Sequence, residues 1–297
     1  MSDDTQNSPC GILLIDKPAG WTSHDVVAKL RGVLGIRRIG HAGTLDPLAT
    51  GLLVVLVGKA TRLMELIPGE KGYKASFRTG FVSDTLDIEG SLRPTGVPAP
   101  GLAEIQAVLP RLTGQIEQIP PMVSAVKVGG RRLYALARQG IEIERKPRPV
   151  TVSALSVKPR TDTRDEFDMS VTCSSGTYIR TIIDDLGRHL GCGAVMTALR
   201  RVRSGPYGVK EARLPEGVAL ALSDGVSAEE LLLPIRGALP EVNTLTLQSG
   251  EIQALYQGKT IHAEGADGLR WLSDGEKVFA LGRVMGASVK LHINFLR

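Results

Sequence analysis

The sequence predicts a chain of mixed helices and strands, with one large domain followed by a smaller module of short strands. Residues 73–78 and 166–173 alternate apolar and polar side chains, as half-buried strands do. Residues 22–35 instead show the apolar spacing of a helix. After residue 231 the composition changes to short strand-like runs separated by glycines. A length of 297 residues accommodates both parts.

Composition places the chain among ordinary globular proteins. Apolar residues make up 42% and charged residues 23%. No apolar run approaches the roughly 20 residues that cross a bilayer, and the polar start (residues 1–10, expected to be flexible) does not resemble a secretory signal. Cys10, Cys173 and Cys192 have no CxxC spacing, which argues against a disulfide framework and a zinc site. We therefore expect a cytoplasmic protein with no metal.

The positive charge is concentrated in the middle of the chain. Net charge is +5 overall, yet residues 120–215 alone hold 17 Lys and Arg against 9 Asp and Glu. Such a basic segment suits a polyanion such as RNA, but charge alone fits a solvated basic surface almost as well.

The first elements read as a strand followed by a capped helix. Residues 11–16 form a short apolar run that ends at a Pro-Ala-Gly turn. Thr22 or Ser23 then caps a helix whose C-terminal end is marked by Gly35.

Residues 37–51 form a loop that contains one acid, Asp46, between glycines and directly before Pro47. Pro47 restricts Asp46 to extended or turn geometry. A carboxylate on such a loop can act as a nucleophile, a base or a ligand. It can equally hydrogen-bond its own turn, and the residues alone leave both interpretations open.

The next segments predict further elements of the large domain. Residues 52–57 read as a strand buried on both faces, and residues 59–67 as a helix. A loop over 92–101 then leads to a helix over 102–112. The acidic segment 83–90 lacks the ligand spacing of a calcium loop, so we assign no metal to it.

Two segments follow in the basic middle of the chain. Residues 119–140 read as a strand, a Gly-Gly turn and a short basic helix, which on its own is a solvated basic hairpin. A helix over 181–190 follows the strand at 166–173. The residues alone allow Arg180 an ion pair with Asp184, worth only about 0.3–0.5 kcal/mol.

From about residue 236 a module of roughly 60 residues, which we expect to be all-β, completes the chain.

Three segments in order carry a family resemblance: residues 40–51 (GHAGTLDPLATG), 176–180 (GTYIR) and 196–205 (MTALRRVRSG). They resemble the motifs of the TruB family, the bacterial tRNA pseudouridine synthases. With the segment at 15–24, which in the family is chiefly structural, the resemblance covers most of residues 11–205 and is weaker beyond. It implies an α+β pseudouridine synthase fold, with a central mixed, largely antiparallel sheet and the active cleft across its middle.

The resemblance also implies a domain organisation. Residues 11–235 would form the catalytic domain, with a thumb-like RNA-binding insertion at about 120–150. Residues 236–297 would form a small β-rich PUA-like domain.

The implied activity is isomerisation of uridine to pseudouridine in the TΨC loop of tRNA, at position 55. Asp46 matches the essential aspartate, and Arg180 would pair with it. Tyr73 would stack on the target base and is also a candidate for the base that removes the C5 proton. Whether Asp46 attacks the base or the ribose stays open.

Further residues would bind the substrate. The resemblance implies that His41 stabilises the flipped-out nucleotide, that Tyr178 contacts the base, and that Leu199 forms an apolar wall. The basic residues expected to contact RNA are Lys127, Arg131, Arg132, Arg138, Arg148, Arg200, Arg201 and Arg203. The expected partner is the T-arm of tRNA, bound by a monomer that needs no cofactor.

Two other functions agree less well with these residues. A non-catalytic tRNA-binding or RNA-folding protein on the same scaffold would have no use for an acid that faces RNA phosphates. A carboxylate-dependent hydrolase normally needs a second acid, and none stands out in the sequence.

Overall fold

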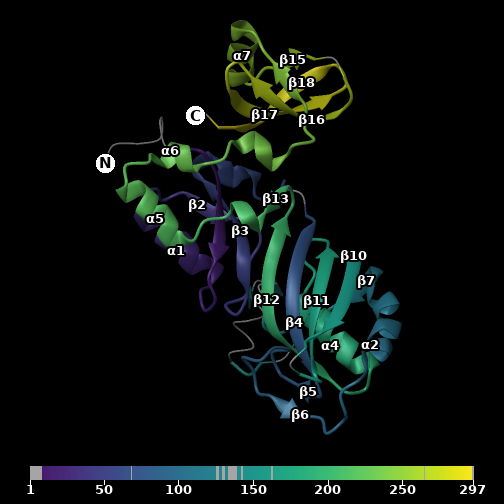
Figure 1. Cartoon of the computed structure of the whole chain (residues 1–297). Coiled ribbons are helices and arrows are strands. Elements are labelled where there is room, and N and C mark those ends of the chain that lie inside the picture. The colour runs from purple at the N-terminus through teal and green to yellow at the C-terminus, as the bar shows by residue number, and fades with distance from the viewer. Residues whose placement is uncertain are drawn as a thin grey trace.

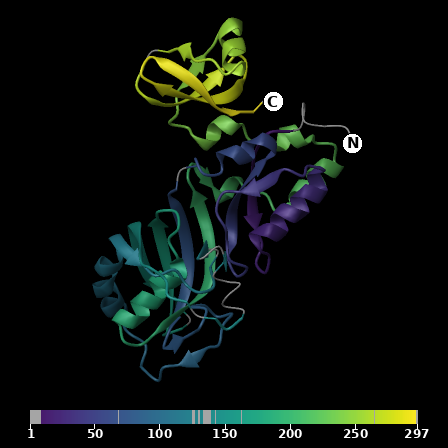
Figure 2. The ribbon, with the colours of Figure 1, turned by 180° about the vertical axis from the view of Figure 1, so that it is seen from behind.

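The computed structural model describes residues 9–67, 69–124, 127–128, 131–132, 139–141, 143–161, 163–263 and 265–295, with backbone only for 127–128 and 131–132. Within them, a large central sheet and a smaller C-terminal sheet form two separate layers, and the smaller sheet lies at one end of the larger one (Figure 1 and Figure 2). No helix in this part of the chain is both long and apolar enough to cross a membrane.

The central sheet is mixed and largely antiparallel, which confirms the expected fold class. Its main strands are, in spatial order, β1 (Gly11–Lys17), β3 (Thr50–Val57), β12 (Ala194–Ser204), β4 (Lys71–Thr79), β11 (Glu166–Cys173), β10 (Arg148–Pro159) and β7 (Gly114–Gln118). Two short strands extend it: β2 (Ile39–His41) beside β3 and β13 (Tyr207–Gly208) beside β12. All these neighbours are antiparallel except β3 and β12, which run parallel.

The parallel contact between β3 and β12 depends on a glycine. Thr50 and Gly51 pair with Arg200 and Arg201. Gly51 has φ of 96°, and a Cβ placed on it would lie 2.3 Å from the carbonyl oxygen of Arg201. Only glycine permits both this backbone conformation and this approach. The loop that carries Asp46 therefore enters the sheet at its middle.

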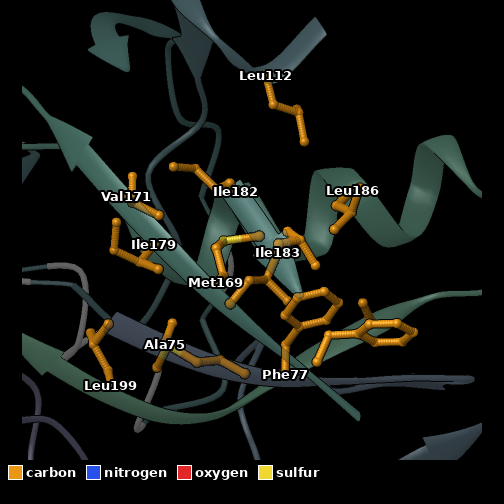
Figure 3. Close-up of a cluster of buried hydrophobic side chains, with 14 of the residues drawn as sticks. Ala75, Phe77, Leu112, Met169, Val171, Ile179, Ile182, Ile183, Leu186 and Leu199 are labelled. Atoms are coloured by element: carbon orange, nitrogen blue, oxygen red, sulfur yellow. The ribbon is translucent and has the colours of Figure 1, made fainter. Parts of the chain in front are cut away.

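Helices α2 (Leu102–Val108) and α4 (Ile179–His189) cover the half of the sheet that contains β4, β11 and β10. Figure 3 shows Ile182, Ile183 and Leu186 of α4 directed toward side chains of these strands. Stacked rings of Phe77 and Phe167, with centroids 5.4 Å apart, extend this core. The burial fixes the start of α4, and with it Arg180, against the sheet.

Helix α1 (Ser23–Leu34) covers the other half of the sheet and packs against α5 (Pro215–Ser223). The Thr22 hydroxyl accepts a hydrogen bond from Asp25 N, and Asp25 accepts one from Thr22 N, so the helix starts with a capping box. Gly35 ends it in the left-handed conformation. The predicted helix is confirmed, with Thr22 as its cap.

The C-terminal sheet has the order β14 (Thr244–Thr246), β16 (Gly268–Ser273), β17 (Val278–Met285), β18 (Ser288–Asn294) and β15 (Ile261–His262). The all-β expectation is wrong in one respect, because helix α7 (Ser249–Tyr256) covers part of this sheet. Trp271 and Phe295 share a buried cluster with Ile12 and Leu56 of the central sheet. Apolar packing therefore attaches the small sheet to the large one.

The remaining elements are short. They are the strand pairs β5 (Phe81–Val82) with β6 (Arg93–Pro94) and β8 (Lys127–Val128) with β9 (Arg131–Arg132), helix α6 (Ala228–Leu231), and the 3-10 helices η1 (Gly58–Leu63), η2 (Leu109–Leu112), η3 (Val209–Glu211) and η4 (Ile235–Ala238). The helix expected at 59–67 is thus a 3-10 helix that ends at Leu63, and the loop expected at 92–101 contains β6. Part of the expected thumb at 120–150, including residues 133–138, lies outside the described residues.

Candidate active site

A pocket of about 280 Å³ opens beside the contact between β3 and β12. Its lining comes from the loop before β3, from β4 and β12, and from the start of α4. The structure brings together here five residues that the sequence singled out: Asp46, Tyr73, Tyr178, Arg180 and Leu199. A carboxylate, a guanidinium and two phenol rings meet in this pocket.

Arg180 makes the central ion pair of the pocket. Its Nη2 lies 2.9 Å from Oδ2 of Asp46. The Arg180 side chain is 3% exposed, whereas Asp46 is 35% exposed and open to the pocket. The guanidinium also donates to the carbonyls of Thr85 at 2.9 Å and Val123 at 2.8 Å. Because its donors are fixed by the backbone, Arg180 holds the Asp46 carboxylate in one orientation.

Asp87 provides a second carboxylate for Arg180, at 3.6 Å from its Nη1. The Thr85 hydroxyl donates to Asp87 at 2.6 Å, and the Glu89 backbone N–H donates at 3.1 Å. An isolated backbone β-bridge between Asp87 and Met196 of β12 attaches the loop that carries Asp87 to the sheet. The acidic segment 83–90 has no role predictable from its sequence, because nothing local shows that it reaches Arg180.

The alternative ion pair expected for Arg180 is not formed. Asp184 lies 2.8 Å from Arg188, one turn further along α4. Asp87 could be taken for the second acid of a hydrolase, but it is buried, its oxygens are bonded, and it does not line the described pocket. The geometry therefore favours a single reactive carboxylate, Asp46.

Two residues near the start of the chain anchor the Asp46 loop. Lys17 is fully buried, and its ammonium donates to the carbonyls of Trp21 at 2.5 Å and Pro47 at 3.2 Å. Burial lowers the pKa of Lys17 to about 8, although the nearby Asp46 carboxylate opposes the shift. Ser23 both donates to Leu45 O at 3.2 Å and accepts from Leu45 N at 2.9 Å.

Arg201 anchors the same loop from β12. Its guanidinium donates to the carbonyls of Leu52 at 2.7 Å, Gly43 at 3.0 Å and Thr44 at 3.3 Å. The residue is 1% exposed. This burial does not fit a surface phosphate contact of the kind expected for Arg201, because its guanidinium is bonded to three carbonyls inside the protein and lines the pocket. Its observed role is to support the Asp46 loop.

The other basic residues expected to contact RNA differ in position. Arg200 forms a two-pronged ion pair with Asp16, at 2.9 and 2.6 Å, and Arg203 pairs with Glu70. Arg148 is exposed at the start of β10. Only the backbone is described for Lys127, Arg131 and Arg132, and Arg138 lies outside the described residues.

The side chain of Gln118, which no sequence motif singles out, positions Tyr178. The Gln118 amide accepts from Tyr178 N at 2.9 Å and donates to Tyr178 O at 3.2 Å. Gln118 is buried at the end of β7. These two bonds satisfy the backbone where α4 begins and fix Tyr178 at the pocket wall.

Tyr73 and Leu199 form the inner wall, on the neighbouring strands β4 and β12. Burial raises the pKa of Tyr73, and a hydrogen bond with Arg201 opposes the shift. Lys71, two residues before Tyr73, also lines the pocket and donates to Ser204 at 2.7 Å. Burial, aided by the charge of Arg201, lowers the pKa of Lys71 to about 8.

His41 stands apart from this group. It ends β2, is half-buried, and is not part of the described pocket lining. Burial lowers the pKa of His41, which favours a neutral imidazole. Among the described residues, no three His, Cys, Asp or Glu side chains are grouped as ligands for a metal ion.

Two family models match the chain in sequence. The model described as TruB family pseudouridylate synthase (N terminal domain) matches residues 31–179, and the tRNA pseudouridylate synthase B C-terminal domain matches residues 180–239.

Curated proteins resemble the chain over most of its length. It is 47% identical to the tRNA pseudouridine synthase B of Syntrophotalea carbinolica, with 84% of this chain and 80% of that protein covered. It is 46% identical to the protein of the same name from Thermobifida fusca, with 87% and 88% covered. The solved structure titled "Crystal Structure of a Cbf5-Nop10-Gar1 Complex" contains a chain of the same fold, with a TM-score of 0.71, 24% identity, and 99% of this chain and 91% of that chain covered.

Proposed function

Because the chain belongs to the TruB family of pseudouridylate synthases, we propose that it isomerises uridine to pseudouridine in tRNA, at position 55 of the TΨC loop. It would act as a cytoplasmic, monomeric isomerase of the intramolecular transferase type. The observation that carries the proposal is the pairing of Asp46 with buried Arg180 at 2.9 Å, inside a pocket walled by two tyrosines.

The reaction breaks a glycosidic bond, turns the base and rejoins it through carbon. The target base must first leave its stack, which costs a few kcal/mol. The pocket offers the flipped base the ring of Tyr73 and the side chains of Tyr178 and Leu199. Asp46, oriented by Arg180, would be the nucleophile.

Tyr73 keeps both of its candidate roles. Burial raises the pKa of its hydroxyl, so the phenol is protonated at neutral pH and can stack on the base without ionising. To take the C5 proton, the hydroxyl would first have to give up its own proton. We propose Tyr73 for base binding, together with Tyr178 and Leu199, and as the candidate for the base that removes the C5 proton.

RNA outside the pocket would be held by the basic middle of the chain. We propose residues 11–235 as the catalytic domain, with a thumb at about 120–150, and residues 236–297 as a PUA-like domain. Exposed Arg148 and the partly exposed Arg200 and Arg203 would approach phosphates of the T-arm. Lys127, Arg131, Arg132 and Arg138 would serve the thumb, and His41 would support the flipped-out nucleotide.

Tritium release tests the proposal. A tRNA transcript labelled at uridine C5 loses tritium only when the C5–H bond is broken. Wild type should release it, and Asp46→Asn should bind the same tRNA without release. A labelled transcript in which cytidine replaces the uridine at position 55 should release no tritium. Binding without release by either protein would instead support the non-catalytic RNA-binding function.

A further inference from the structure

Ser124 places an unpartnered hydroxyl in the wall of the pocket. The residue is 6% exposed and lines the pocket together with Asp46 and Arg180. Its Oγ has no hydrogen-bond partner in the structure. A buried hydroxyl without a partner costs free energy, and such groups often await a ligand or a water molecule.

The position of Ser124 is fixed by its neighbours. The Val123 carbonyl accepts a 2.8 Å bond from Arg180, the guanidinium that also holds Asp46. Ser124 N donates to Met122 O at 3.0 Å, which closes a tight turn. Gln118, which precedes these residues at the end of β7, forms two hydrogen bonds with the backbone of Tyr178. The hydroxyl thus belongs to the same bonded framework as the nucleophile.

Other buried polar side chains of the pocket are already bonded. Arg180 and Arg201 donate to carbonyls, Lys71 donates to Ser204, and the Tyr73 hydroxyl is bonded to Arg201. Among the described residues that line the pocket, only Ser124 has a buried side-chain atom that lacks a partner.

We infer that the Ser124 hydroxyl hydrogen-bonds to the carbonyl edge of the flipped uracil. This inference rests on the proposed function. Tyr73 and Leu199 contact the faces of a ring, but O2, N3–H and O4 lie at its edge and lose their water on entering the pocket. A serine hydroxyl donates to a carbonyl, so the Ser124 hydroxyl and a uracil carbonyl oxygen that has lost its water each gain a hydrogen-bond partner.

The chemistry of the reaction suits such a contact. To exchange N1 for C5 at the ribose, the detached base must turn about the axis through C6 and N3, which interchanges O2 and O4. A hydroxyl that donates to one carbonyl before the turn meets the other carbonyl after it. Ser124 can therefore retain the base while no covalent bond joins the base to the ribose.

The test compares Ser124→Ala with wild type in single-turnover tritium release. We expect the ratio of rate constant to half-saturating concentration to fall about 5- to 20-fold, the size of one lost hydrogen bond. The thermal midpoint should stay equal or rise, because an unsatisfied buried hydroxyl has been removed. Ser124→Cys, similar in size but a weak donor, should lose nearly as much activity. Ser170→Ala, on exposed β11 surface, is the matched control and should behave as wild type.

Binding to an RNA with an abasic site at the target locates the contact. Wild type and Ser124→Ala should bind this RNA equally, since the base is absent. Unchanged activity of Ser124→Ala, full activity of Ser124→Cys, or a lost activity matched by a lowered thermal midpoint would overturn the inference. Failure of wild type to release tritium would overturn the proposed function itself, so the two failures are distinguishable.

Discussion

The guanidinium of Arg180 lies 2.9 Å from the carboxylate of Asp46, although the two residues lie far apart in the chain. The pair forms where a loop before β3 meets the first turn of α4. The geometry of the pair depends on the planar guanidinium group, because Arg180 donates to two backbone carbonyls and contacts Asp46 at the same time.

Arg180→Lys should reduce the single-turnover rate of tritium release by about 100-fold or more. Lysine keeps the charge but cannot reach the same three partners, so Asp46 loses its fixed orientation. Binding of tRNA should change less than about threefold, because the pair lies inside the pocket. A rate within threefold of wild type would show that charge alone suffices.

Asp87→Asn should reduce the rate by about tenfold, less than the change at Arg180. The amide preserves size but removes the second negative charge beside the guanidinium, so Arg180 is held less firmly. Asp84→Asn makes the same chemical change in the same loop, where Asp84 is exposed and bonds only to Ser91 N among its described contacts. Equal rates for the two variants would refute a role for Asp87.

Gly51→Ala should lower the free energy of unfolding by about 3 kcal/mol or more. The new Cβ would lie 2.3 Å from Arg201 O, which cannot move without breaking the contact between β3 and β12. Gly225→Ala provides the control, because Gly225 has a similar φ of 91° and open space around it. It should cost only about 1–2 kcal/mol by urea denaturation; a similar loss in both variants would mean that backbone strain, not the clash, dominates.

Stability should depend on pH through Lys71, whose pKa is lowered to about 8. Between about pH 8 and 10.5 the unfolded chain holds the lysine proton more tightly than the folded chain, so stability rises with pH in this window. The contribution is lost as pH falls through 8. Urea denaturation should show wild type gaining about 1–3 kcal/mol over Lys71→Met between pH 7.5 and 10. A constant difference would contradict the burial of a charged Lys71.

Local patterns predicted the elements whose signals are contained in a few residues. The cap at Thr22, the stop at Gly35 and the apolar run of β3 are of this kind. Strand β10 was missed because its exposed face is polar and prolines lie near its ends. Helix α7 was missed because eight residues carry too short an apolar period.

The site divides in the same way. Asp46, Tyr73, Tyr178, Arg180 and Leu199 were found through motifs, and the structure places them in one pocket. Asp87, Lys71 and Ser124 were assigned no role, because their importance comes from contacts between distant segments. The burial of Arg201 was unpredictable for the same reason: beside Arg200 and Arg203 it reads as one more surface cation.

The insertion of β12 between β3 and β4 sets an order of assembly on the ribosome. Asp46 is synthesised early, but the carbonyls of its loop find the Arg201 donors only after the chain has been translated through β12. Until then β3 and β4 have no strand to join them. A nascent chain that stops before Ala194 would carry Asp46 without the Arg201 donors that support its loop, so the pocket is completed only late in translation.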